Sequence, residues 1–381
     1  MIDIQKELPE IFDDFADSRK EAFLKVKEVK DQDIPVIGQF CTFFPQELAV
    51  AMGATSVSLC STSDETIPEA EKHLPKNLCP LIKSSYGFAI TDKCPFFYFS
   101  DLVVGETTCD GKKKMYEYLA EVKNVHVMEL PNKNNENSLM LWKDEIIKMK
   151  EILEEQFGVE ITEERIRKAV RIKNAERSAM KDFYGIMKED ELPMMGLDLW
   201  HVLYGVQFVF DKEAIPGQMK ELKKKILSES KKITGKPRIL ITGCPIGAAT
   251  EKVIEAVENN GGVVVAYENC GGAKAIDENV DEGAEDIYDA IARKYLNIGC
   301  ACISPNKKRL DLLDRMVDEY KVDGILDMQL QACQPYQVES LAIKRFANRD
   351  KDLPFMAIET DYSQSDIGQL NTRIAAFIEM I

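Results

Sequence analysis

Two parts of the chain alternate short apolar runs with helical stretches, and this alternation restricts the possible folds more than any other feature. The runs that we predict to be strands are 34–40, 55–59, 96–106 and 125–130 in the first part, and 237–242, 263–267, 323–328 and 354–359 in the second. Strands that alternate with helices are typical of a parallel sheet covered by helices. We therefore expect an α/β fold with two parallel-sheet domains.

A long helical segment separates the two alternating parts. From Leu139 to about Lys232 the chain is dense in Glu, Lys, Leu, Ile and Met, and Thr162 followed by two acids predicts a helix N-cap. We prefer subunit contact as the role of these helices, with a solvated bundle as the alternative. The expected divisions are an N-terminal helix in 1–33, a first α/β domain in 34–138, a helical segment in 139–235 and a second α/β domain in 236–381. The opening helix, over 4–30, is expected to be exposed or to face a partner.

The acidic composition argues against a nucleic-acid partner. The 381 residues include 65 Asp and Glu against 49 Lys and Arg, a net charge of −16, whereas binding to a phosphate backbone requires a basic surface. Residues 1–20 carry acids throughout and have no apolar core, unlike a signal or transit peptide. No apolar run approaches the ~20 residues that span a bilayer. We expect a cytoplasmic protein without membrane contact, whose thiols are kept reduced.

The ten cysteines follow a pattern that packing alone would not produce. Cys79 and Cys94 each precede a proline, and Cys300 and Cys302 share a Gly-Cys-Ala-Cys loop. The other six come just after predicted strands, and they are Cys41, Cys60, Cys109, Cys244, Cys270 and Cys333. In open parallel sheets the carboxyl ends of the strands line the crevice where ligands bind. We therefore expect many of these thiols to line a cleft.

Four interpretations of the thiols remain open from spacing alone. Buried packing is the default for any single cysteine. Structural zinc usually needs C-x₂₋₄-C pairs, but the chain has no CxxC and only three histidines, none of them near a cysteine pair. A nucleophile is conceivable at Cys109 or Cys244, near predicted helix starts, but leaves the other eight unexplained. An iron–sulfur cluster held from scattered loops uses more of them.

Several longer segments, from about Ile34 onward, have a distinctive sequence, and they are CTFFPQELAVAMGA from Cys41, LCST at Cys60, LPKNLCPLIKSSYGF, VVGETTCDGKKKMYEYL, RILITGCPIG, VDGILDMQLQAC and ETDYSQSDIGQLNTRIAAFIEM. These segments resemble one known family, the 2-hydroxyacyl-CoA dehydratases and benzoyl-CoA reductases. Within them, GETTCDGKKKMYEYL and LCPLIKSSYGF are most similar to the double-cubane cluster proteins.

The resemblance implies two Rossmann-like domains with an iron–sulfur cluster in the cleft between them. It implies Cys41, Cys109 and Cys333 as ligands of a [4Fe-4S] cluster. For the [8Fe-9S] double cubane it implies three more thiolates, which we predict to be Cys79, Cys94 and Cys302. The cysteines then left for packing or support are Cys60, Cys244, Cys270 and Cys300, with Cys300 able to replace Cys302.

The main functional hypothesis is an iron–sulfur oxidoreductase component, a homodimer of anaerobic metabolism, that reduces a small molecule. It would receive low-potential electrons from an ATP-hydrolysing iron–sulfur reductase of the activator type. ATP is expected on that partner, because GCPIG at 243–247 lacks the G-K-[ST] ending of a phosphate loop. The alternative is a subunit of a 2-hydroxyacyl-CoA dehydratase with one [4Fe-4S] cluster. A non-catalytic electron-storage or binding protein is the second alternative.

Three polar residues near the predicted ligands are considered as supporting groups. Glu47 follows Cys41 by six residues, Ser84 belongs to a Lys-Ser-Ser run near Cys79, and Thr108 precedes Cys109. The alternatives without a functional role are a solvated acid for Glu47, a helix-surface residue for Ser84 and a turn residue for Thr108. The lysines at 112–114 are expected to be a solvated helix face or part of a docking surface for the reductase.

Overall fold

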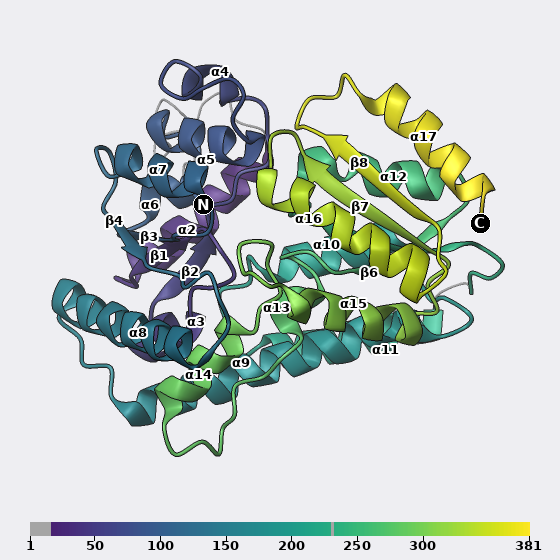
Figure 1. The fold of residues 1–381 in the computed structure, drawn as a ribbon. Coiled ribbons are helices and arrows are strands. Elements are labelled where there is room, and N and C mark those ends of the chain that lie inside the picture. The colour runs from purple at the N-terminus through teal and green to yellow at the C-terminus, as the bar shows by residue number, and fades with distance from the viewer. Residues whose placement is uncertain (1–16, 230–231) are drawn as a thin grey trace.

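Two four-stranded parallel sheets with helices on both faces lie side by side (Figure 1). The structure is a computed structural model, and it describes residues 17–229 and 232–381. The strand order is β2-β1-β3-β4 in the first sheet and β6-β5-β7-β8 in the second, so the two halves share one topology. The expected α/β architecture with two parallel sheets is confirmed.

Seven of the eight predicted strands form close to the expected positions. The first sheet contains β1 (Val36–Gln39), β2 (Thr55–Ser58), β3 (Leu102–Glu106) and β4 (Val125–Met128). The second contains β5 (Arg238–Gly243), β6 (Val263–Tyr267), β7 (Gly324–Leu330) and β8 (Phe355–Thr360). The prediction of a strand over 96–106 is wrong in its first part, because α6 (Pro95–Phe99) is a short helix. Pro95 fixes a helical φ at the first turn, where its missing N–H costs nothing.

Helices cover the two faces of the first sheet with separate sets of apolar side chains. Val36 and Val103 face α5 (Pro80–Ile90) and α7 (Asp110–Leu119), whereas Ile37 and Val104 face the opposite layer. That layer contains α3 (Gln46–Met52), α8 (Glu136–Phe157) and α9 (Glu163–Tyr184), with Trp142 buried at its centre. The alternation of side chains along each strand explains this division. The short helix α4 (Ile67–Ala70) precedes α5.

The helical segment consists of α8, α9, α10 (Gly196–Val206) and α11 (Ile215–Glu229). The Thr162 hydroxyl accepts from the N–H of Arg165, as the N-cap prediction required, and Asn135 caps α8 through the N–H of Ser138. The buried faces of α8 and α9 pack on the first sheet, so they do not form a solvated bundle of their own. Subunit contact by their outer faces stays a prediction.

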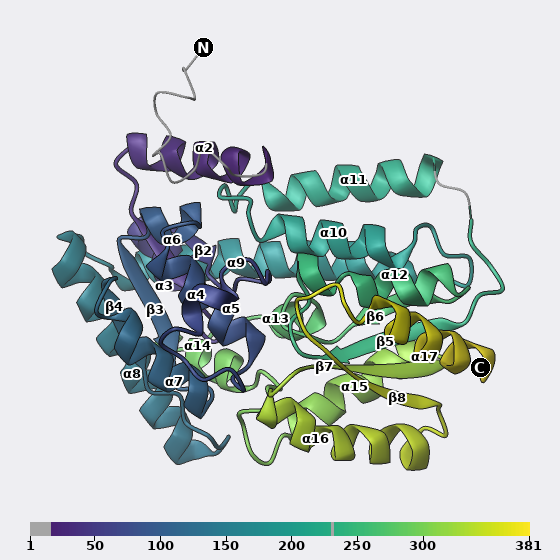
Figure 2. The ribbon, with the colours of Figure 1, turned by 90° about the horizontal axis from the view of Figure 1, so that it is seen from above.

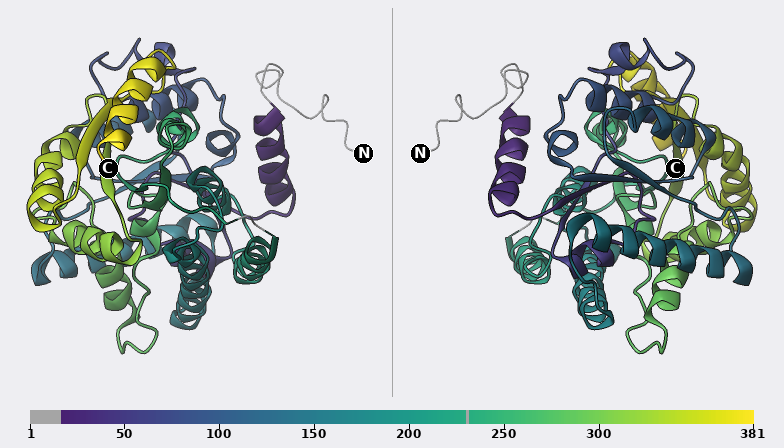
Figure 3. Two further views of the ribbon diagram at one scale, coloured as in Figure 1. Left: turned by 90° about the vertical axis from the view of Figure 1, so that its right-hand side faces the viewer. Right: turned by 90° about the vertical axis from the view of Figure 1, so that its left-hand side faces the viewer.

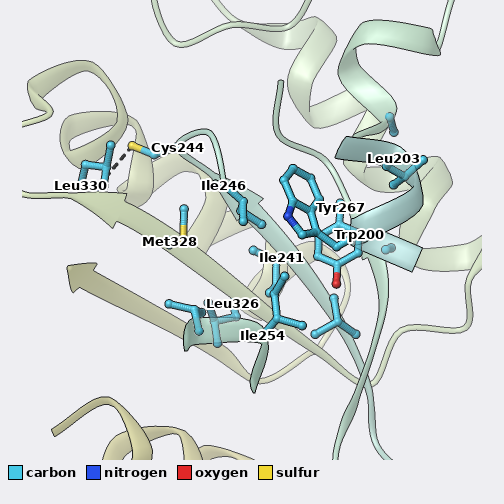
Figure 4. Close-up of a cluster of buried hydrophobic side chains, with 14 of the residues drawn as sticks. Trp200, Leu203, Ile241, Cys244, Ile246, Ile254, Tyr267, Leu326, Met328 and Leu330 are labelled. Atoms are coloured by element: carbon cyan, nitrogen blue, oxygen red, sulfur yellow. Dashed lines mark hydrogen bonds between the residues drawn. The ribbon is translucent and has the colours of Figure 1, made fainter. Parts of the chain in front are cut away.

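The second sheet carries α10 and α12 (Lys252–Asn259) on one face and α15 (Lys307–Glu319) and α16 (Gln334–Arg345) on the other (Figure 2). Its core packs Ile241, Ile254 and Leu326 against the rings of Trp200 and Tyr267 (Figure 4). The C-terminal helix α17 (Ile367–Glu379) packs beside α12. None of the described helices is long and apolar enough to cross a membrane.

The opening helix is packed and not freely exposed. Its described part, α2 (Asp17–Asp31), lies along the first half (Figure 3), with Phe23 buried against the Phe99 ring at a centroid distance of 5.2 Å. The predicted residues 4–16 lie outside the described part of the chain. A freely exposed helix is therefore excluded for 17–31, because Phe23 and Val26 bury its apolar face, whereas contact of its outer face with a partner stays a prediction.

One helix from the second half packs within the first. Helix α14 (Ile287–Leu296) lies against α8 and α9, and Ile291 and Tyr295 join the core beneath the first sheet. Arg167 of α9 donates to the carbonyls of Ala284 and Glu285 just before α14. The two halves are thus held together by α14, which packs within the first half, as well as by a shared hydrophobic core. The short helix α13 (Ala273–Ile276) contacts α9 in the same region.

Candidate metal centre

A cavity of about 1490 Å³ lies between the two halves, and all ten cysteines of the chain line it. None of them forms a disulfide. The expectation that the thiols line a cleft is therefore confirmed. Packing cysteines would be distributed over both cores, so their gathering around one cavity favours a shared chemical role.

The thiols come from equivalent places in the two sheets. The first three strands of each half are each followed by a cysteine within three residues. These cysteines are Cys41, Cys60 and Cys109 after β1, β2 and β3, and Cys244, Cys270 and Cys333 after β5, β6 and β7. The fourth strands, β4 and β8, are at the sheet edges and have none. Because parallel strands end at one edge of a sheet, the topology alone delivers three thiols per half to the cavity.

Cys79, Cys244 and Cys333 form one group of thiols, which we call the Cys333 group. Hydrogen bonding with Cys333, together with burial, raises the pKa of Cys79 well above its usual value. The Cys333 thiol is also hydrogen-bonded to Cys244. The Cys244 sulfur in turn accepts from the N–H of Leu330 at 3.2 Å (Figure 4). The group combines one thiol of the first half with two of the second.

Cys41, Cys109, Cys300 and Cys302 form a second group, which we call the Cys302 group. The sulfurs of Cys300 and Cys302 are 3.2 Å apart. The hydrogen bond with Cys300 raises the pKa of Cys302, and the nearby thiols of Cys41 and Cys109 raise it further. Hydrogen bonding from Cys302 lowers the pKa of Cys300, and the ammonium of Lys274 acts in the same direction. This group too joins both halves.

The structure brings all six predicted ligands to the cavity. Five of them belong to the two groups, and Cys94, the residue before α6, lines the same cavity. Among residues 17–229 and 232–381, no three His, Cys, Asp or Glu side chains are arranged to hold a single metal ion. The thiolates of a cluster bind different irons, so they need not converge on one point as the ligands of a single ion do. The ligand assignments stay predictions.

Lys112 is a cavity residue that the sequence analysis missed. Its side chain is buried, and Nζ lies 3.4 Å from the carbonyl oxygen of Phe40 and 4.0 Å from the Cys60 sulfur. The expectation of a solvated face is wrong for this lysine, although Lys113 and Lys114 lie in exposed ion pairs. A sequence signal existed, because Lys112 shares the apolar helix face of Met115, Tyr116 and Leu119.

The three polar residues considered as supporting groups have different positions. Glu47 is fully buried and is not among the residues that line the cavity, so the solvated alternative is wrong, and a supporting role stays a prediction. Ser84 is also buried, and its hydroxyl donates to the carbonyl of Ser63 at 2.6 Å, which anchors a loop of the cavity wall. Thr108 lines the cavity next to Cys109.

Comparison with known proteins assigns the family. Residues 41–381 match the family described as HGD-D, 2-hydroxyglutaryl-CoA dehydratase, D-component. The chain belongs to this family. This confirms the resemblance noted in the sequence.

The relatives are of nearly the same length as this chain. YjiM of Escherichia coli (strain K12), named provisionally as a dehydratase subunit, is 56% identical over 98% of this chain and 99% of its own. The (R)-phenyllactyl-CoA dehydratase beta subunit of Clostridium sporogenes is 24% identical over 97% of each chain. The (R)-2-hydroxyglutaryl-CoA dehydratase subunit beta of Acidaminococcus fermentans is 20% identical over 92% of this chain and 94% of its own. These names support the dehydratase alternative better than the double-cubane reductase.

Proposed function

We propose that this chain is the cluster-binding subunit of an enzyme of the 2-hydroxyacyl-CoA dehydratase type, with a [4Fe-4S] cluster in the cavity between the sheets. The observation that carries the proposal is the lining of one cavity by all ten cysteines. Family membership and relatives named as dehydratase beta subunits support it. The partners that we infer are a second, non-identical subunit and an ATP-hydrolysing iron–sulfur reductase. The proposed substrate is a small 2-hydroxyacyl thioester.

The donor set fits such a cluster. Iron–sulfur clusters are held mainly by thiolates, and Cys41, Cys109 and Cys333 would hold this one from the ends of β1, β3 and β7. When bound, the cluster supplies one-electron transfer to the substrate. The chain's own residues bury the thiolates, and Lys112 places a positive charge beside them. Burial and nearby charge are the features by which a protein adjusts the potential of a cluster.

Alanine substitution of the predicted ligands tests the proposal. We expect Cys41→Ala, Cys109→Ala and Cys333→Ala each to lose most of the iron bound by the anaerobically purified chain. Cys60→Ala is the matched control, because Cys60 lines the same cavity but donates to the carbonyl of Phe40 at 2.6 Å and is not a predicted ligand. Iron content that is unchanged in all three ligand variants would contradict the proposal.

The number of thiols favours a second proposal, a double-cubane cluster, because one cubane needs only three of the ten cysteines. In a reductase component with an [8Fe-9S] double cubane, Cys79, Cys94 and Cys302 would be further ligands. The contact of Cys79 with Cys333, and the position of Cys302 beside Cys41 and Cys109, support it. Cys302→Ala separates the two proposals, because it would lower the iron content of a double cubane and leave that of a single cubane unchanged.

A further inference from the structure

Basic side chains gather in one part of the lining of the cavity. Four cations from α9, α14 and the loop before α11 line it, namely Lys173, Arg177, Lys212 and Lys294. The chain as a whole has a net charge of −16, so this local excess of positive charge is not a property of its general composition. We call these four residues the basic wall.

Two of the four cations are neutralised by carboxylates. Arg177 Nη2 donates to Glu47 Oε1 at 2.5 Å, and Lys173 forms an ion pair with Glu176. Lys173 also donates to the side-chain oxygen of Gln46 at 2.7 Å. These pairs account for both carboxylates in contact with the wall.

No carboxylate in the described part of the chain is in contact with the other two cations. Among the described residues, Lys212 Nζ makes no hydrogen bond or ion pair. Its backbone is fixed beside α11 because Asp211 Oδ1 accepts from the N–H groups of Glu213 and Ala214. Lys294 Nζ lies 3.9 Å from the centre of the Tyr295 ring and 3.5 Å from the carbonyl oxygen of Ala275. Counting only groups in direct contact, the wall therefore has four cations and two carboxylates.

Burial makes this excess costly unless a ligand offsets it. The exposed fractions of Lys173, Arg177 and Lys294 are only 4–5%, whereas Lys212 is half-buried, so most of the wall is shielded from solvent. Burial, followed by the charges of Arg177 and Lys173, lowers the pKa of Lys294 well below its usual value. Burial also lowers the pKa of Lys212, to about 8. Carboxylates outside contact distance, Glu176 for Lys212 and Glu47 and Glu278 for Lys294, oppose these shifts without cancelling them.

We propose that the basic wall, through Lys212 and Lys294, binds a compact oxyanion, and that this oxyanion is a carboxylate or phosphate group of the substrate. The burial of most of the wall favours a small group, and the thiol groups line the same cavity. A substrate held by this anion would present its other end to the remainder of the cavity. The identification of the anion with the substrate rests on the proposed function, whereas anion binding itself does not.

Anion-dependent stabilisation of the full chain, purified anaerobically, tests the proposal. Succinate and inorganic phosphate are the probes, and chloride at equal ionic strength is the control for screening. We expect succinate, phosphate or both to raise Tm beyond the effect of chloride, because a ligand that binds the folded state stabilises it. Succinate alone would indicate a carboxylate site, phosphate alone a phosphate site, and both a general oxyanion site.

Two variants connect the effect to the basic wall. In Lys212→Met and Lys294→Met we expect the apparent Kd of the anion to rise at least roughly tenfold, since each loses a charge-assisted hydrogen bond. Lys220→Met is the matched control on an exposed position of α11, and it should bind as the unmodified chain does. Stabilisation no greater than that by chloride, or an unchanged Kd in both wall variants, would overturn the proposal. Iron measured on the same samples reports separately on the proposed function.

Discussion

Glu47 is a buried carboxylate whose charge is kept by its neighbours. Burial alone would raise its pKa, but the charges of Arg177 and Lys294 and the hydrogen bonds from Arg177 and Tyr295 together outweigh burial, and the pKa is lowered to about 2. The hydroxyl of Tyr295 also donates to Glu47 Oε2 at 2.7 Å. Because the folded-state pKa lies below the usual value of 4.5, this group stabilises the fold above about pH 4.5. The stabilisation is lost as the pH falls from about 4.5 towards 2.

The Glu47→Gln variant tests this account. We expect it to lower the free energy of unfolding at pH 7 by about 3 kcal/mol, because Arg177 is left buried without its counter-charge. The difference from the unmodified chain should shrink as the pH falls below 4.5. Urea denaturation across this range measures both effects. Glu117→Gln is the control, since its pair with Lys114 is exposed and should contribute little; an equal loss in both variants would refute the account.

The six cysteines after strands were predicted at the residue level, whereas the burial of Lys112 and of Glu47 was not. A cysteine that follows an apolar run needs only local sequence to be placed at the end of a strand. The partners of Glu47 are 130 and 248 residues away, so its burial depends on tertiary contacts. Lys112 was misread because its neighbours Lys113 and Lys114 suggested a solvated face, although its spacing to Leu119 indicated a buried one.

The turn after β5 shows how a single element positions a thiol. Gly243 has φ of +111°, and a Cβ atom there would lie 2.1 Å from the carbonyl oxygen of Met328 on β7. The next residue, Cys244, donates its N–H to that same carbonyl at 2.8 Å. Only glycine permits both the positive φ and the close approach of the two strands. The direction of the Cys244 thiol therefore depends on this glycine.

Replacement of Gly243 by alanine should disturb both the turn after β5 and the position of the Cys244 thiol. We expect Gly243→Ala to lower the free energy of unfolding by about 3 kcal/mol, from backbone strain and the clash with β7. Gly217→Ala on α11, where a Cβ meets nothing within 4 Å, is the control and should not be destabilised. Chemical denaturation of both variants provides the comparison. A Gly243→Ala chain as stable as Gly217→Ala would show that the close approach carries no cost.

Strands and helices that are marked by local sequence signals were predicted well, and the exception is residues 96–99. The aromatic run 96–99 has the composition of a strand, but Pro95 and the packing of Phe97 in the core make it a helix. The proline was present in the sequence, and its preference for the first turn of a helix was the missed signal. Helix boundaries set by side-chain caps, such as Thr162, needed no tertiary information.

At the scale of the whole molecule, two halves of the same strand order each place three thiols that follow strands, and two others, around one cavity. The sequence predicted the alternation and the cleft, but the equivalence of the two sheets emerges only from the strand order. The crossing of α14 into the first half also could not be read from sequence, because it depends on contacts with α8 and α9. Both thiol groups join the halves, so a bound cluster would bridge them.

The most direct test of the central claim is the content of iron and acid-labile sulfide per chain after anaerobic purification. The proposed dehydratase-type subunit predicts about four irons and about four sulfides per chain. About eight irons with about nine sulfides would favour the double cubane instead. A folded chain that binds no iron and no labile sulfide, with all ten thiols free, would contradict the account.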